Sequence, residues 1–232
     1  MRSEELSLIR ELPLFAGVTN TTFDKLVRAS YLQFFPPHVR LVNEGDPADF
    51  LYVVVEGCLE LFAEANGHDT TVALVRPPSS FILAAVLTDS TYLLSARTLE
   101  KSRLLLIPAE NIRQAMDSDT AFTHAIVHDM AWAYRTIVKS HKNHKLRSTI
   151  ERLANYLLSE EKIQNGQGRI TLPHDKRTLA SLLGMTPENL SRAFGTLRQY
   201  QVEINGREVH LNSLEDLRAL AKPTPLIDDA EM

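Results

Sequence analysis

Three polar residues near the C-terminus, Glu188, Ser191 and Arg192, have the types and spacing of a surface that recognises base pairs. Residues three and four apart lie on one face of a helix, so these side chains can reach the same partner. Arginine can donate two hydrogen bonds to guanine, glutamate can accept one from the amino group of cytosine, and serine can take either role or contact a thymine methyl group. The alternative is a surface ion pair between Glu188 and Arg192 in the favourable order, which leaves the surrounding sequence unexplained.

Two short helices joined by a glycine turn are predicted to position these side chains. Leucines at i, i+3 and i+4 predict an amphipathic helix from about Asp175 to Leu183. Gly184 is expected to end it, because glycine tolerates the left-handed backbone of a sharp turn. Thr186 and Pro187 form a strong helix start, since threonine caps an orphan amide and proline needs no donor there. The buried face of the second helix is expected to consist of Leu190, Ala193, Phe194 and Leu197.

A strand before these helices and a hairpin after them complete the pattern of a winged helix-turn-helix. The strand is expected over residues 169–172 and the hairpin over residues 202–211, where apolar residues flank Asn205 and Gly206. Asn-Gly is a strong hairpin signal, because both residues accept a positive φ. By position, contacts with the DNA backbone are assigned to Lys176, Thr186 and Arg207.

The charges of the chain are divided unevenly. Residues 1–138 hold 11 Lys and Arg against 17 Asp and Glu, residues 139–222 hold 14 against 9, and residues 223–232 add −3 to give −4 overall. The basic C-terminal region suits contacts with phosphates. The N-terminus lacks the basic start of a secretory signal, and no apolar run approaches a membrane span. We therefore expect a cytoplasmic protein that binds double-stranded DNA and has no contact with a membrane.

The first half of the chain alternates short β-like runs with turn signals. Eight runs over residues 31–108, LQFF, VRLV, FLYVVV, CLELFAEA, TTVALV, FILAAVL, YLLSART and SRLLLI, predict a β-sandwich or rolled sheet. Residues 40–62, with Gly45 and Gly57 in their turns, resemble the cyclic-nucleotide-binding β-roll of CRP/FNR transcription regulators. Residues 12–17, LPLFAG, fit the start of the same family.

The residues that hold cyclic AMP in that family are absent at the matching positions. Family members use a Gly-Glu pair and an Arg-Ser pair, whereas the alignment places two serines at 79–80 and Ser-Thr at 90–91. An anionic phosphate buried without a charge partner is costly, so cyclic AMP is not expected to bind. The apolar stretch 81–94 either lines an effector cavity or fills the roll, and filling is favoured. An effector cavity would be lined by Ser79, Ser80, Phe81, Leu83, Ser90 and Thr91.

The cysteine and histidine content limits the cofactors. Cys58 alone cannot hold the iron-sulfur cluster of oxygen-sensing family members, and we expect it in the core. Haem remains a candidate cofactor for sensing nitric oxide, because family members with a similar recognition helix respond to nitric oxide. His124 and His128 lie at i, i+4 on an expected helix and can share a metal, although surface or hydrogen-bonded histidines are commoner. The other candidate ligands are His38, His68, His141 and His144.

A long helix is expected over residues 109–147, because this stretch has no internal glycine or proline. One of its stripes can pack on the β-roll through Phe122, Ile126 and Ala133. A second stripe repeats at alternating steps of three and four, the spacing of a coiled-coil seam with a second copy. The seam consists of Val127, Met130, Tyr134, Ile137 and His141, followed by His144.

The sequence thus predicts an α+β protein with four parts. They are a sensory β-roll (1–108), a dimerisation helix (109–147), a winged helix-turn-helix (148–222) and a flexible acidic tail (223–232). Glu188, Ser191 and Arg192 resemble the E-x-x-S-R motif of the FNR subgroup, which implies a homodimer on a palindrome near TTGAT, spacer, ATCAA. RNA polymerase is the implied partner of an activator. No enzyme activity is expected, and the signal is expected to differ from a cyclic nucleotide.

Three alternatives remain open for the function. The chain can be a ligand-binding regulatory subunit whose C-terminal domain contacts a protein, which the basic charge and the base-recognising side chains disfavour. It can be a haem redox protein. It can also be a regulator that senses nothing and is controlled by its own abundance.

Overall fold

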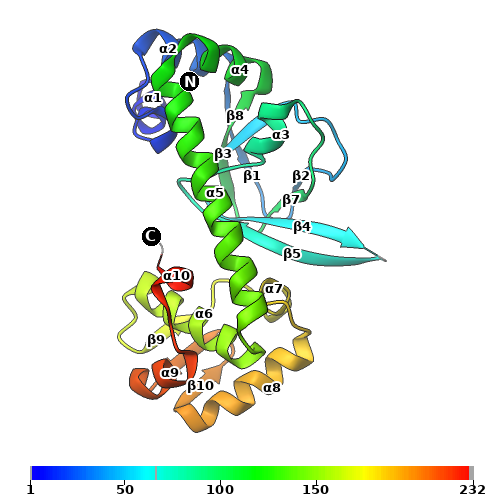
Figure 1. Cartoon of the computed structure of the whole chain (residues 1–232), viewed down its shortest axis with the longest axis vertical. Helices are drawn as coiled ribbons and strands as arrows, with labels where there is room; N and C mark the ends of the chain where they lie inside the picture. The colour runs from blue at the N-terminus through cyan, green and yellow to red at the C-terminus, as the bar shows by residue number, and fades with distance from the viewer. Residues whose placement is uncertain (1, 66, 230–232) are drawn as a thin grey trace. The chain divides into compact units, whose positions relative to one another are not determined.

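The computed structural model describes residues 2–65 and 67–229. The chain divides into two compact units, Met1–Ala133 and Tyr134–Met232, and each has its own hydrophobic core. The boundary falls within the long helix α5 (Thr120–Leu146), so this helix contributes to both units. The two β-sheets of the first unit and the mainly helical second unit confirm the α+β class (Figure 1).

The first unit is built on two four-stranded antiparallel sheets, with strand orders β1-β8-β3-β6 and β2-β7-β4-β5. The expected β-runs are confirmed except for the one at residues 81–87. Figure 1 shows the β4–β5 hairpin projecting from the remaining strands. The strands are β1 (Tyr31–Phe35), β2 (Arg40–Val42), β3 (Phe50–Glu56), β4 (Leu59–Ala65), β5 (His68–Val75), β6 (Ser80–Phe81), β7 (Ser95–Thr98) and β8 (Ser102–Pro108).

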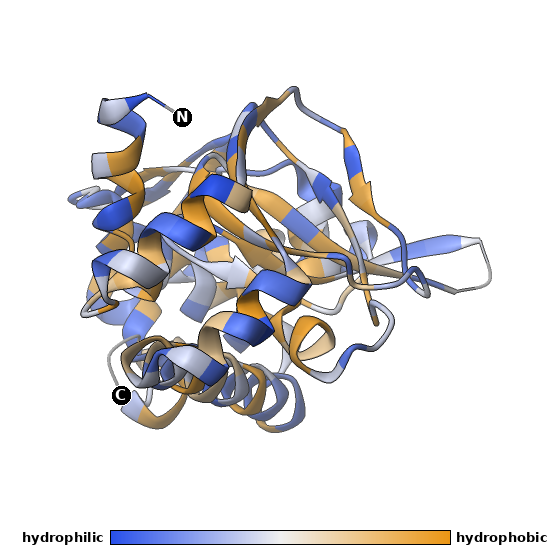
Figure 2. Cartoon of the chain, turned by 90° about the horizontal axis from the view of Figure 1, so that it is seen from above, coloured by the Kyte–Doolittle hydropathy of each residue, from blue (hydrophilic) through white to orange (hydrophobic). Residues whose placement is uncertain are grey.

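Helices bury apolar side chains against these sheets. Ile9, Leu26 and Ile112 each lie on one face of a helix and are almost fully buried in the core. Each such side chain stabilises the fold by about 1.5–3 kcal/mol relative to exposure. Figure 2 shows apolar stretches along the strands and mixed apolar and polar turns along the helices. The covering elements are α1 (Ser3–Arg10), the 3-10 turn η1 (Pro13–Phe15), α2 (Asn20–Ala29) and α4 (Ala109–Ser118).

The run at residues 81–87, expected to be a strand, is mostly helix. The chain leaves β6 through Ile82, whose φ of 65° turns it sharply, and α3 spans Leu83–Thr88. Leu83 and Val86 are buried at helical i, i+3 spacing, and the alanines between them favour a helix over a strand. The prediction of a strand was wrong here, because the periodicity of a short apolar run does not distinguish a strand from a buried helix.

The single helix expected over residues 109–147 is in fact two helices, α4 and α5, separated at Asp119. The backbone of Asp119 is extended, with φ −137° and ψ 103°. Its Oδ1 accepts hydrogen bonds from the N–H groups of Ala121 (3.0 Å) and Phe122 (3.1 Å), and its Oδ2 accepts one from the Thr19 hydroxyl (2.7 Å). Asp119 therefore caps a new helix and ties it to the start of α2.

The second unit packs helices against a three-stranded antiparallel sheet of order β10-β11-β9. Leu157, Leu190 and Phe194 lie in its core. The strand and the two helices of the predicted helix-turn-helix are confirmed. The elements are α6 (Thr149–Gln164), β9 (Arg169–Thr171), α7 (Lys176–Leu182), α8 (Pro187–Leu197), η2 (Arg198–Tyr200), β10 (Val202–Asn205), β11 (Glu208–Leu211), α9 (Leu214–Ala221) and α10 (Pro225–Asp228).

The wing hairpin forms where it was expected, but its turn is shifted by one residue. Asn205 pairs with Glu208 in the strand register, so the two turn residues are Gly206 and Arg207. Of the residues in this hairpin, only Gly206 has a positive φ, 63°, whereas the Asn-Gly pattern predicted it for Asn205 as well. Glycine at the first turn position with a negative φ at the second matches a type II′ turn, which suits the twist of paired strands.

Residues 223–229 are held against the end of α5. Arg147 donates two hydrogen bonds to the carboxylate of Asp228 (2.6 and 2.5 Å), and Lys139 donates one to the backbone oxygen of Asp229 (2.6 Å). The Arg147 side chain is only 7% exposed. The tail expected to be flexible over 223–232 is therefore an ordered strap as far as 229, and residues 230–232 lie outside the described residues.

Candidate nucleic-acid interface

The turn between α7 and α8 is closed by two hydrogen bonds of the Schellman type. The Gly184 N–H donates to the carbonyl of Ser181 (2.9 Å), and the Met185 N–H donates to that of Ala180 (3.0 Å). Gly184 has a φ of 62°, and a Cβ on it would lie 2.9 Å from the ring of His144. Gly184 thus ends the first helix as predicted, for both conformational and steric reasons.

Helix α8 begins as predicted and exposes the predicted side chains. The Thr186 hydroxyl accepts a hydrogen bond from the Asn189 N–H (3.3 Å), and a proline occupies the first helical position. Leu190, Ala193, Phe194 and Leu197 are buried. Glu188, Ser191 and Arg192 are exposed on the opposite side of the first turns. This geometry presents three polar side chains on a rigid, capped helix end.

Arg192 and Glu188 do not form the surface ion pair of the alternative interpretation in the described part of the chain. Arg192 donates instead to the side-chain oxygen of Asn189 (2.7 Å). The pKa of Glu188 is held below its usual value, first by its own backbone N–H, then by the Thr186 hydroxyl, then by the charge of Arg192. Glu188 therefore presents a carboxylate acceptor. The sequence analysis assigned no role to Asn189, although its i, i+3 spacing from Arg192 is compatible with this side-chain hydrogen bond.

A buried arginine supports the turn and was missed in the sequence. Arg152 on α6 donates from Nε to the Leu183 carbonyl (2.8 Å) and from Nη2 to the Gly184 carbonyl (3.3 Å). Its Nη1 donates to the Arg147 carbonyl (2.9 Å). Burial lowers the pKa of Arg152, but arginine stays protonated in proteins. Arg152 therefore joins the α5–α6 junction to the turn of the helix-turn-helix.

The three candidates for contacts with the DNA backbone have different environments. Lys176 and Thr186 are exposed at the N-terminal ends of α7 and α8, where anions are favoured. Arg207 donates from Nε to the Leu172 carbonyl (2.9 Å) and from Nη2 to the Pro173 carbonyl (2.5 Å). Its guanidinium therefore fastens the wing to the segment before α7, which leaves fewer donors for a phosphate.

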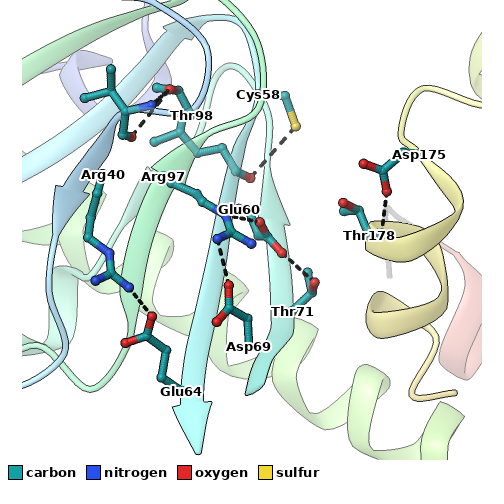
Figure 3. A network of polar contacts seen from close by, with 12 residues as sticks. Arg40, Cys58, Glu60, Glu64, Asp69, Thr71, Arg97, Thr98, Asp175 and Thr178 are labelled. Atoms are coloured by element: carbon teal, nitrogen blue, oxygen red, sulfur yellow. Dashed lines mark hydrogen bonds and ion pairs between the residues drawn. The ribbon is translucent and has the colours of Figure 1, made fainter. Parts of the chain in front are cut away.

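In the β-roll, Arg97 on β7 is already paired with carboxylates. Arg97 donates to Glu60 (2.6 Å) and Asp69 (2.8 Å), and its guanidinium lies 4.3 Å from the centre of the Phe62 ring (Figure 3). Glu60 also accepts a hydrogen bond from Thr71 (2.5 Å), and its side chain is only 3% exposed. This network neutralises Arg97 within the β2-β7-β4-β5 sheet, so its charge is not available to an anionic ligand.

The six candidates for an effector cavity lie in different environments. Phe81 stacks on Tyr52, with ring centres 5.2 Å apart, and Leu83 is buried in the core. Ser80 lines the cavity between η1, β3 and the first turns of α5, and its hydroxyl donates to Asp129. The stretch thus mainly fills the roll. The remaining candidates, all exposed, are Ser79, Ser90 and Thr91.

The histidine candidates are also dispersed. His68 is exposed at the start of β5, whereas His124 and His128 line one cavity. The Nε2 of His128 accepts a hydrogen bond from the indole N–H of Trp132 (3.2 Å), so this nitrogen is occupied. No group of three or more His, Cys, Asp or Glu residues in residues 2–65 and 67–229 is placed to hold a metal ion. His144 faces the turn at Gly184, and Cys58 is buried as expected.

The predicted seam on α5 is largely exposed. Val127, Tyr134 and Ile137 are 58%, 67% and 66% exposed, and His141 is exposed as well. Met130 instead packs partly against the core of the first unit. Phe122 and Ile126 are buried on the roll as predicted. Ala133, expected beside them, is exposed.

Comparisons with known proteins agree on both halves of the chain. Two family models match, the cyclic nucleotide-binding domain over residues 32–119 and the Crp-like helix-turn-helix domain over residues 151–220. The transcriptional activator protein anr of Pseudomonas aeruginosa is 23% identical over 186 residues, which cover 78% of this chain and 76% of that protein. The potassium channel GORK of Arabidopsis thaliana is 26% identical over 113 residues, which cover 48% of this chain but 14% of the channel.

A solved structure supports the fold. A transcriptional regulator described as a member of the CRP/FNR family, from Eubacterium rectale, has a TM-score of 0.75 at 17% identity. The match covers 91% of this chain and 98% of that one. Within the described residues, none of the helices combines the length and the apolar character needed to cross a membrane.

Proposed function

Because the chain belongs to the CRP/FNR superfamily of transcription regulators, we propose that it binds a palindromic operator as a homodimer. The observation that carries this proposal is the exposed face of α8, where Glu188, Ser191 and Arg192 project from a capped helix end. An α-helix fits the major groove, and two such helices related by a twofold axis fit half-sites about 34–36 Å apart.

The side chains support a particular half-site. Arg192 would donate to the guanine of a G·C pair, Glu188 would accept from its cytosine, and Ser191 would contact a neighbouring thymine. Together with the resemblance of the motif to E-x-x-S-R, this favours a palindrome near TTGAT, spacer, ATCAA. Lys176 and Thr186 would bind phosphates at the helix ends, and the wing residue Arg207 would add at most its remaining donors.

Dimerisation through α5 is supported by the exposed apolar side chains of Val127, Tyr134 and Ile137. Apolar residues at alternating steps of three and four favour packing against an identical helix. Activation through RNA polymerase is the proposed mode of regulation, since the relative in Pseudomonas aeruginosa is named a transcriptional activator.

The signal is proposed to be something other than a cyclic nucleotide, because Arg97 is neutralised by Glu60 and Asp69. Haem, the cofactor suggested for nitric oxide sensing, fits the described residues poorly. The His124 and His128 pair cannot act together through Nε2, because Trp132 occupies that atom of His128. A regulator controlled only by its own abundance stays the alternative.

Mobility-shift titrations of the full chain test the proposal. The probes are duplexes with the palindrome, with one half-site and with a scrambled sequence, each over a range of salt concentrations. We expect the palindrome to bind about 10³-fold or more tighter than the scrambled duplex, with affinity falling as salt rises. Equal affinity for both would contradict operator recognition. The absence of binding to every duplex would favour a regulatory subunit that contacts a protein.

A further inference from the structure

A cavity of about 470 Å³ lies in the first unit, between the segment around η1, strand β3, the start of β6 and the first turns of α5. Leu12, Leu14 and Val53 supply apolar surface. On α5, the small side chains of Ala121 and Ala125 face the cavity and leave room beside the helix. The volume lies in the range of small-molecule sites in proteins.

The polar groups of this cavity have a definite chemistry. Asp129 accepts a hydrogen bond from the Ser80 hydroxyl through Oδ2, and no ion pair joins it to a cation in the described part of the chain. His128 accepts from Trp132 through Nε2, so in its neutral form the hydrogen is on Nδ1. His124 is exposed at the rim. The cavity thus combines an apolar surface with one carboxylate whose charge is not neutralised.

We propose that this cavity binds the effector, a small molecule with an apolar body and a neutral or cationic head that donates a hydrogen bond to Asp129. An anionic head is disfavoured, because it would be brought close to a carboxylate that has no cation beside it. The inference deepens the proposed function by naming the chemical class of the signal. Its charge preference is opposite to that of a cyclic nucleotide.

Because Asp129 lies on α5, a ligand that binds it can affect this helix. The Ser80–Asp129 hydrogen bond joins β6 to α5, and Val127 and Tyr134 of the seam lie on the same helix. A donor that binds Oδ2 of Asp129 would compete with the Ser80 hydroxyl, whereas one that binds Oδ1 would share the carboxylate with it. In both cases the ligand lies at the hydrogen bond that joins the sheet to the helix on which the proposed dimer depends.

Trp132 provides a direct readout, because it is the only tryptophan of the chain and is hydrogen-bonded to a residue that lines the cavity. The full chain is titrated with benzylamine, benzyl alcohol and benzoate, three probes with the same ring and different heads. We expect a saturable change in Trp132 fluorescence with benzylamine and benzyl alcohol. Benzoate should bind at least about tenfold more weakly.

Two variants and one control sharpen the test. Asp129→Asn has the same shape without the charge, so benzylamine should lose its advantage over benzoate. Ala125→Leu narrows the cavity beside α5 and should weaken the binding of benzylamine and benzyl alcohol by at least about tenfold. Asp117→Asn removes an exposed charge at the end of α4 and should leave the titrations unchanged. Circular dichroism establishes that each variant is folded.

The proposal is overturned if no probe gives a saturable change, if benzoate binds as well as benzylamine, or if Asp129→Asn keeps the preference of the unmodified chain. It is also overturned if Ala125→Leu binds benzylamine as tightly as the unmodified chain does. None of these titrations contains DNA, so they are independent of operator binding. A chain that fails in the mobility-shift titrations and still binds benzylamine through Asp129 would retain the cavity proposal as a ligand site.

Discussion

Two arginines in the two units show how differently the same side chain can be used. Arg97 of the β-roll is held by two carboxylates and lies over the ring of Phe62. Arg192 of α8 is exposed and donates only to the neutral side chain of Asn189 in the described structure. An arginine can serve an external partner only where its charge is not already neutralised. The difference favours a role in recognition for Arg192 and a role in stability for Arg97.

The largest expected effect follows from removing Arg97. Arg97→Ala leaves Glu60, whose side chain is 3% exposed, without its cation. Breaking this partly buried pair should lower the free energy of unfolding by about 2–3 kcal/mol, because Glu60 is buried but Arg97 is 31% exposed. Urea denaturation followed by circular dichroism measures it. Arg40→Ala is the matched control, because its pair with Glu64 is largely exposed and should contribute no more than about 1 kcal/mol.

If Arg97→Ala were as stable as the unmodified chain, the structural role of this arginine would be refuted. Discrimination between operator and scrambled DNA by the folded variant should stay unchanged.

Arg192→Ala should show the reverse pattern. We expect a loss of about 1–3 kcal/mol of binding free energy on the operator and relaxed discrimination at one base pair. The stability of the protein should change by no more than about 0.5 kcal/mol, because the side chain is exposed. Arg218→Ala on α9 removes the same charge from another exposed site and serves as the control. Equal losses on operator and scrambled DNA would contradict base recognition.

Lys176→Ala should give a smaller effect that does not depend on sequence. An exposed lysine at the start of α7 is expected to neutralise one phosphate. Its loss should weaken binding to all duplexes alike and reduce the slope of log affinity against log salt by about 1. An unchanged slope would remove Lys176 from the interface.

The last prediction concerns acid pH and leaves DNA binding aside. Hydrogen bonds from the Thr19 hydroxyl and the Phe122 N–H hold the pKa of Asp119 well below its usual value. The resulting stability is present above the unfolded pKa of about 4 and is lost as the pH falls towards the lowered folded pKa. Unfolding of Asp119→Asn and the unmodified chain should therefore differ at pH 6 and converge in strong acid. A difference that is constant with pH would contradict this account.

The parts of the fold that could be predicted are those with local signals. Gly184, Thr186 and Pro187 fixed the ends of two helices because each acts on its own backbone or that of its neighbours. The break at Asp119 had a local signal that was missed, because Asp119 caps the N–H groups of Ala121 and Phe122. Its bond to Thr19 could not be predicted, because Thr19 lies 100 residues earlier. Arg152 was missed for the same reason, since its acceptors are carbonyls of a turn 31 and 32 residues later.

The candidate effector site shows a second reason why part of the molecule could not be predicted from the sequence. The alignment of residues 79–91 predicts that the charged partners of a phosphate are absent, and the six candidates that it gave lie on a strand, a helix and loops in different environments. The cavity beside α5 draws on residues from four separate segments. Only packing brings Leu12, Ser80 and Asp129 together, so no spacing in the sequence could indicate it.

The ordered strap that follows α9 has a practical consequence for dissecting the molecule. A DNA-binding fragment ended at residue 222 would keep the core of the second unit but lose Asp228. The guanidinium of Arg147, nearly buried at the α5–α6 junction, would then lack its carboxylate. We expect fragments that extend to residue 229 to be more soluble and more stable. Affinity tags placed directly after Asp228 should be avoided.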